Sequence, residues 1–173
     1  MEGVQMNERN LRFINRFSIY HVNKPETVAE HSYYVTYYAW KIAKDFEGAG
    51  IKIDFRKLLE KALVHDLEET KTGDIITHAK TPIIKNEINN ISKKILPIDV
   101  YEIWKDAKDD TIEGQIIEFA DSYEVLVYCL EEIKSGNKHM ISIFETQIKK
   151  IKQEDPIFKK YIKDIQEQYD RTD

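Results

Sequence analysis

The residues best suited to chemistry are concentrated between Ala62 and Lys80, where the sequence reads ALVHDLEETKTGDIITHAK. His65 and Asp66 directly follow three apolar residues, at the end of an expected helix that should pack against a core. Burying an imidazole and carboxylates is costly unless each group is paired or bound to a metal ion. Because residues four apart share one face of an α-helix, we expect Glu69 to lie one turn beyond His65. This stretch predicts a reactive site if other segments supply further ligands.

Two further candidate ligands stand on other expected helices. His31 lies in the first turn of one helix, although a lone histidine is usually a surface or hydrogen-bonded residue. Asp121 lies in the strongly periodic stretch 111–135, where its neighbours at helical spacing are Ile117 and Val125. It could face water, but a carboxylate in an apolar row is the least expected polar residue of the chain. With the histidine–aspartate pair above, these residues form a nitrogen–oxygen set that suits Mn²⁺, Co²⁺, Fe²⁺ or Mg²⁺ and leaves room for water and substrate.

Helices are expected to position all of these side chains. Only six glycines and four prolines interrupt the 173 residues, and no segment reads convincingly as a strand. A capping box, Thr27 with Glu30, marks one helix start, and Asp54 can cap another. The pattern predicts an all-α helical bundle that forms a single domain over residues 1–173. We expect its helices over residues 8–20, 27–46, 55–70, 83–96, 100–107, 111–135, 140–152 and 157–169.

Composition and charge restrict the class of function. Hydrophobic residues make up 42% of the chain and charged residues 33%, which is typical of a soluble globular protein. No apolar run approaches the roughly 20 residues that span a bilayer, and the N-terminus lacks a signal-peptide core, so we expect no membrane partner. A net charge of −5 supplies no basic field for binding a nucleic-acid polymer. The single cysteine, Cys129, excludes an intramolecular disulfide and fits a reducing, cytoplasmic compartment.

The order of these residues resembles the HD-domain superfamily of metal-dependent phosphohydrolases, in which helices present the ligands as H…HD…D. An HD pair alone is a weak signal, but here the agreement extends to the 5′-deoxynucleotidase branch of that superfamily. The resemblance covers residues 9–133, whereas the last expected helices, over 138–170, add little to it. The motifs that carry it are Arg16 before the first ligand, EHS at 30–32, HDLEE at 65–69, TGD at 72–74, AD at 120–121 and CLEE at 129–132.

The resemblance implies a single domain of the HD type and a metal-dependent phosphomonoesterase. Such an enzyme would hydrolyse deoxyribonucleoside 5′-monophosphates to a deoxynucleoside and phosphate, so a small nucleotide is the implied partner. By the same resemblance, the divalent metal would be bound by His31, His65, Asp66 and Asp121. Glu69 would hold or deprotonate the attacking water, and Arg16 would orient the phosphate. The implied substrate contacts are Arg16, Phe17, Asp66, Asp74 and Thr77.

Departures from the family pattern concern the substrate more than the chemistry. Phe17 stands where this branch often has Trp, which keeps an aromatic face but loses the indole N–H. Ile76 and His78 stand where Pro is frequent in the substrate loop. Two alternatives remain open: another HD-type hydrolase acting on phosphodiesters or nucleoside triphosphates, and a non-catalytic helical module that keeps a metal for stability. Glu69 and Arg16, which a structural metal does not need, argue against the second alternative.

Two other features have ordinary interpretations. Glu68 is expected to be a solvated glutamate at a helix end. An aromatic series on the helix after Thr27 is more typical of a core or a subunit contact than of a base-stacking platform. A homodimer is therefore possible, with these residues at the contact between two copies of the chain. The residues are Tyr33, Tyr34, Tyr37, Tyr38 and Trp40.

Overall fold

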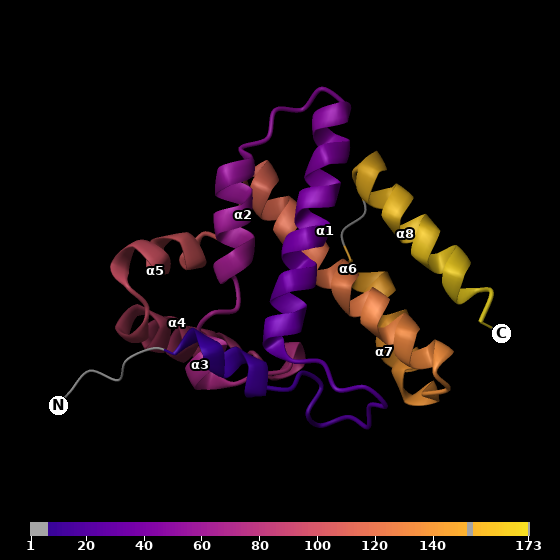
Figure 1. Ribbon diagram of the computed structural model, residues 1–173, viewed down its shortest axis with the longest axis horizontal. Helices are drawn as coiled ribbons and strands as arrows, with labels where there is room; N and C mark the ends of the chain where they lie inside the picture. Colours follow the sequence, from indigo (N-terminus) through magenta and orange to yellow (C-terminus); the bar gives the residue numbers. More distant parts are fainter. Residues whose placement is uncertain (1–6, 152–153, 173) are drawn as a thin grey trace.

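The computed structural model describes residues 7–151 and 154–172, and helices dominate this part of the chain (Figure 1). Within those residues the only β-type pairing is an isolated bridge between Asn15 and Thr27. The predicted all-α class is confirmed, whereas the single domain over residues 1–173 stays a prediction. The helices are α1 (Val28–Gly48), α2 (Phe55–Val64), α3 (Glu69–Thr72), α4 (Pro82–Ile95), α5 (Ile98–Lys105), α6 (Ile112–Lys134), α7 (Ile141–Lys150) and α8 (Pro156–Tyr169), with 3₁₀ helices η1 (Glu8–Phe13), η2 (Thr77–Ala79) and η3 (Lys138–Met140).

The core forms where α1 crosses α6, with α2 on one side of the crossing and α7 and α8 on the other (Figure 1). Ile42 of α1 and Ile116 of α6 are both fully buried there. Phe119 of α6 stacks on Phe158 of α8 with ring centroids 4.1 Å apart. No helix in the part of the chain described here is long and apolar enough to cross a membrane. The crossing brings His31 and Asp121, which are 90 residues apart in sequence, into one region.

The start of α1 is fixed by the predicted capping box. The Thr27 hydroxyl accepts from the Glu30 backbone N–H at 3.2 Å, and the Glu30 carboxylate accepts from the Thr27 N–H at 2.8 Å. Such a cap stabilises a helix by about 1 kcal/mol. Because the helix register is set at Thr27, His31 falls on the inward face of the first turn, where its side chain is fully buried.

The predicted helix over residues 8–20 is wrong beyond Phe13. After η1, the chain pairs with the segment that precedes α1: the Arg16 N–H donates to the Glu26 carbonyl at 2.8 Å, and the Val28 N–H donates to the Ile14 carbonyl at 2.9 Å. A helix would need these groups for its own ladder. Long-range pairing therefore overrides the helical pattern and turns Arg16 toward α1.

The predicted helix over residues 55–70 is correct as far as Val64, where α2 ends, and wrong beyond it. His65 Nδ1 lies 2.7 Å from the Ala62 carbonyl oxygen, so the imidazole satisfies one of the carbonyls left free at the helix end. Tight turns follow, with the Leu67 N–H donating to the Val64 carbonyl at 3.0 Å. His65 and Glu69 consequently do not share a helical face, and a short α3 begins at Glu69.

Candidate active site

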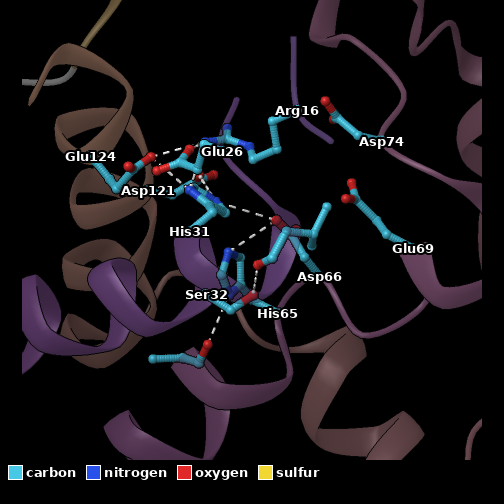
Figure 2. Close-up of polar contacts among 12 residues, drawn as sticks. Arg16, Glu26, His31, Ser32, His65, Asp66, Glu69, Asp74, Asp121 and Glu124 are labelled. Atoms are coloured by element: carbon cyan, nitrogen blue, oxygen red, sulfur yellow. Dashed lines mark hydrogen bonds and ion pairs between the residues drawn. The ribbon is translucent and has the colours of Figure 1, made fainter. Parts of the chain in front are cut away.

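Three helices bring the four predicted metal ligands together. Donor atoms of His31, His65 and Asp121 all lie within 4.8 Å of one another. Asp66 Oδ2 lies 3.4 Å from His31 Nε2 and 3.2 Å from His65 Nε2, and Asp121 Oδ1 lies 3.1 Å from His31 Nε2. Figure 2 shows the two imidazoles and the two carboxylates converging from α1, the turn after α2, and α6. The cluster is two-nitrogen, two-oxygen in character, as the sequence predicted.

The two imidazoles are oriented as metal ligands would be. Their Nε2 atoms are buried and have no hydrogen-bond partner in the described residues. His65 Nδ1 faces the Ala62 carbonyl, which only accepts, so this nitrogen carries the proton and Nε2 keeps its lone pair. His31 Nδ1 lies 2.6 Å from a Glu124 carboxylate oxygen, and this contact directs its Nε2 at Asp66 and Asp121. Orphaned buried nitrogens beside two carboxylates fit a divalent cation. That these residues bind one stays a prediction.

Both carboxylates of the cluster stay ionised. Burial raises their pKa values, but neighbouring imidazoles and Lys108 hold the pKa of Asp66 and of Asp121 well below the usual range. Lys108 Nζ lies 2.5 Å from Asp121 Oδ2. Although burial lowers the pKa of Lys108, Asp121 and Asp66 raise it above its ordinary value. Lys108 was not among the predicted site residues, because nothing in its own segment relates it to Asp121.

Arg16 is held at this site by two buried carboxylates. Its Nη1 lies 2.9 Å from Glu26 Oε2, 2.9 Å from Glu124 Oε2 and 2.7 Å from His31 Nδ1. Arg16 Nη1 and His31 Nδ1 both lie within hydrogen-bond distance of the same oxygen, Glu124 Oε2. Burial lowers the pKa of Arg16, but Glu124 and Glu26 raise it above its ordinary value. Arg16 therefore lies beside the predicted metal ligands, as Figure 2 shows. Its Nη1 already donates to Glu26 and Glu124 within the protein.

Glu124 and Glu26 are two further site residues that were not predicted from the sequence. Glu124 follows Asp121 by three residues on α6 and therefore points the same way from that helix. Both glutamates are less than 10% exposed. A second carboxylate one turn after Asp121 was the available signal, but an isolated glutamate on a long helix is usually solvated.

Glu69 lies beside Asp66, but it does not share a helical face with His65 as predicted. Donor oxygens of Asp66, Glu68 and Glu69 lie within 4.8 Å of one another, and Glu69 Oε2 is buried without a hydrogen-bond partner among the described residues. Burial, followed by the charges of Asp66 and Asp74, raises the pKa of Glu69 to about 9. At neutral pH this carboxyl therefore holds its proton in the metal-free protein, and a bound cation would lower its pKa toward the ionised form that a general base needs. Lys80 offers partial compensation, with its Nζ 3.8 Å from Glu69 Oε1.

The expectation that Glu68 is solvated is wrong. Its side chain is buried and accepts a 2.6 Å hydrogen bond from Trp104 Nε1, in the segment of α5. Burial, followed by the charge of Asp66, raises the pKa of Glu68 to about 7. The tight turns after Val64 explain the error, because they direct Glu68 toward α5 where a continuous helix would not.

The loop over residues 73–77, which is predicted to bind substrate, meets the segment of Arg16 through Asp74. Gly73 adopts a left-handed φ of 69°, and the following Asp74 accepts from the Phe17 N–H at 3.3 Å. Phe17 itself has a φ of 55°, a strained value for an aromatic residue, and its ring stacks on Tyr128 at 5.1 Å. Strain of this kind is typical of functional segments. Thr77 is exposed at the start of η2.

Two cavities lie beside the start of α1, away from the imidazoles. One of about 210 Å³ is lined by residues that include Glu26, Tyr34 and Tyr128, and another of about 420 Å³ is lined by residues that include Arg12 and Tyr34. Glu26 connects the first cavity to Arg16. These two cavities are thus not lined by the predicted metal ligands, and the candidate site is defined by the positions of its donor atoms.

A family model for the 5′-deoxynucleotidase YfbR-like proteins matches residues 6–169. The chain belongs to this family. It is 32% identical to a 5′-deoxynucleotidase of Photorhabdus laumondii over 73% of this chain and 72% of that protein. It is 30% identical to a dATP triphosphohydrolase of cyanophage S-2L over 78% of this chain and 82% of that protein. The family predicted from the sequence is thus confirmed.

The fold is that of solved HD phosphohydrolases. DatZ, an HD phosphohydrolase of cyanophage S-2L, superposes with a TM-score of 0.70 and 21% identity, covering 95% of each chain. That structure holds dA and one catalytic Zn²⁺ ion. At this identity the similarity establishes the shared fold.

Proposed function

We propose that this member of the YfbR-like family is a metal-dependent phosphomonoesterase that hydrolyses deoxyribonucleoside 5′-monophosphates. The observation that carries the proposal is the pair of buried Nε2 atoms of His31 and His65, which lie beside Asp66 and Asp121 and have no hydrogen-bond partner among the described residues. A purely structural role would not require Glu69, a buried carboxyl with a raised pKa, beside that cluster. The family match and the named relatives support deoxynucleotides as the substrate class.

His31, His65, Asp66 and Asp121 would hold the cation. Their mixed donor set supports Mn²⁺, Co²⁺, Fe²⁺ or Mg²⁺ as the resident ion, and Zn²⁺ belongs in the same comparison because DatZ binds it. When bound, such an ion supplies Lewis-acid polarisation of the phosphoryl group and of the attacking water.

The remaining residues act on the water and the substrate. Glu69 positions the attacking water or takes its proton, since its Oε2 is buried beside Asp66 and has no hydrogen-bond partner among the described residues. Arg16 offers its remaining N–H groups to the phosphate oxygens, while Glu26 and Glu124 hold its Nη1. We assign the substrate's sugar and base to Phe17 and to the loop from Asp74 to Thr77. The proposed substrate contacts are Arg16, Phe17, Asp66, Asp74 and Thr77.

A second candidate function is favoured by one observation, the similarity to the cyanophage dATP triphosphohydrolase. The two activities differ in the product released, which is inorganic phosphate for a monophosphatase and triphosphate for a triphosphohydrolase. Purified protein should be incubated with deoxy- and ribonucleoside mono-, di- and triphosphates in the presence of each divalent metal. Phosphate released from deoxynucleoside monophosphates, and abolished by a chelator, is the expected result. Triphosphate release with inert monophosphates would establish the second candidate.

We also infer a homodimer that uses the outer face of α1. Tyr33, Tyr37 and Trp40 follow one another at helical spacing and are 66%, 47% and 43% exposed. Exposed aromatic residues of this kind are enriched at protein–protein contacts. Light scattering on the wild type and on Tyr37→Lys tests the inference, and a wild-type monomer at micromolar concentration would refute it.

A cytoplasmic location is supported by the nucleotide substrate and by the unpaired thiol of Cys129.

A further inference from the structure

Lys108 stands in the loop between α5 and α6 and directs its ammonium at a predicted metal ligand. Its Nζ lies 2.5 Å from Asp121 Oδ2, while Asp121 Oδ1 lies 3.1 Å from His31 Nε2. The two oxygens of one carboxylate thus face different partners, an imidazole of the candidate metal site and an ammonium. The Lys108 side chain is 35% exposed, so a ligand that reaches the cluster can also reach this lysine.

The loop that carries Lys108 is fixed on both sides of it. Ala107 is 3% exposed, and Asp109 Oδ2 pairs with the buried Lys61 Nζ at 2.7 Å. Gly114 of α6 lies so close to Asp109 that a Cβ there would overlap with it. These contacts tie the loop to α2 and α6, so the position of Lys108 beside Asp121 is built into the fold.

Charge at the site leaves a place for a second cationic side chain. Asp66 and Asp121 together balance the charge of one divalent ion, because imidazole ligands are neutral. Arg16 carries one positive charge but donates to both Glu26 and Glu124. A phosphate monoester with its second pKa near 6 carries between about −1.5 and −2 charges at neutral pH. Lys108 is a positive group beside the cluster whose ammonium is not already held by Glu26 and Glu124.

We propose that Lys108 binds the phosphoryl group of the substrate, and that Asp121 holds its ammonium until a divalent cation takes over that carboxylate. The proposal rests on the proposed function of the site. A lysine suits this transfer, because its compact charge ends a flexible stem and can swing between two acceptors around a fixed Cα. Once the cation neutralises Asp121, the Lys108 N–H groups are free to donate to a phosphate oxygen. Phosphate binding should consequently depend on both the metal and Lys108.

The test measures the binding of inorganic phosphate to Mn²⁺-loaded protein by calorimetry, for the wild type, Lys108→Met and Lys108→Arg. Lys105→Met is the matched control, since Lys105 is exposed on the same segment and pairs only with Glu102 among its described contacts. Loss of a hydrogen bond to a charged group predicts a rise in the phosphate Kd of about 10- to 100-fold for Lys108→Met. Lys108→Arg should restore part of the affinity, and Lys105→Met should behave as wild type. Metal content is measured on each variant, and circular dichroism confirms its fold.

Three results would overturn the proposal. The first is a phosphate Kd for Lys108→Met within twofold of wild type. The second is an equal loss in Lys105→Met, which would indicate a general effect of surface charge. The third is loss of Mn²⁺ from Lys108→Met, which would make Lys108 a structural partner of Asp121. Hydrolysis assays distinguish a failure of this inference from a failure of the proposed function. If phosphate binding depends on Lys108 but no nucleotide is hydrolysed, only the proposed function is refuted. If Lys108→Met hydrolyses nucleotides and binds phosphate as the wild type does, only the inference about Lys108 is refuted.

Discussion

Glu124→Gln tests whether the buried network around His31 prepares it to bind a metal. The Glu124 carboxylate accepts from His31 Nδ1 at 2.6 Å and from Arg16 Nη1 at 2.9 Å. The first contact fixes the imidazole tautomer, so that Nε2 presents its lone pair to the candidate metal position. The substitution keeps the shape of the side chain and removes its charge.

The expected loss is a tenfold or larger weakening of metal affinity. Hydrogen bonds to charged groups contribute about 1.5–3 kcal/mol, and removal of the outer partner of a ligating histidine typically costs about 10- to 100-fold in affinity, which is about 1.4–2.7 kcal/mol. Because glutamine keeps an oxygen that can accept from His31 Nδ1, we expect about 10-fold for Glu124→Gln and about 100-fold for Glu124→Leu. The hydrogen-bond energy and the affinity loss agree in size because both describe the contact between His31 Nδ1 and Glu124.

The assay is a competition between chelator-stripped protein and a fluorescent Mn²⁺ indicator at fixed pH. Glu131→Gln is the control, because Glu131 lies on the same helix and is exposed. A folded Glu124→Gln variant with wild-type Mn²⁺ affinity would refute the reasoning, since the tautomer of His31 would then be set by something other than Glu124. An equal loss in Glu131→Gln would trace the effect to the overall charge of α6.

Other predictions concern Glu69 and Asp121. Glu69→Gln should lower kcat by about 10²- to 10⁴-fold while metal content stays at the wild-type level, because general acid–base contributions are of that size; near-wild-type kcat would remove Glu69 from the mechanism. Asp121→Ala should instead lose the metal, and atomic absorption on the purified variant checks this. The pKa of Glu69 is raised from about 4.5 to about 9 by burial and then by neighbouring carboxylates, so the folded state holds a proton that the unfolded chain releases. Its stability contribution is complete below about pH 4.5 and is lost as the pH rises through about 9, so the Tm of metal-stripped protein should fall between pH 5 and pH 9, by roughly 5 °C or more. Glu69→Gln should flatten that fall, and a wild-type profile that rises over this range would contradict the assignment.

The sequence by itself determined the helices and the candidate ligands. Helical periodicity and capping residues are local properties, so the start of α1 at Thr27 and the long α6 could be predicted from neighbouring residues. An imidazole and carboxylates next to apolar residues are costly to bury without partners, and this cost indicated His65, Asp66 and Asp121 as candidate ligands. The family resemblance added His31.

Only the tertiary structure decided where those helices stop and which charges face the site. The chain leaves its helical pattern at Ile14 because its backbone pairs with the segment before α1, and it leaves α2 at Val64, where the His65 ring takes the place of a backbone donor. Glu124 and Lys108 belong to residue types that are usually solvated, and no local feature relates Glu124 to His31 or Lys108 to Asp121. Their roles arise from contacts between segments far apart in sequence. Such contacts depend on how the helices cross, which periodicity along a single helix does not encode.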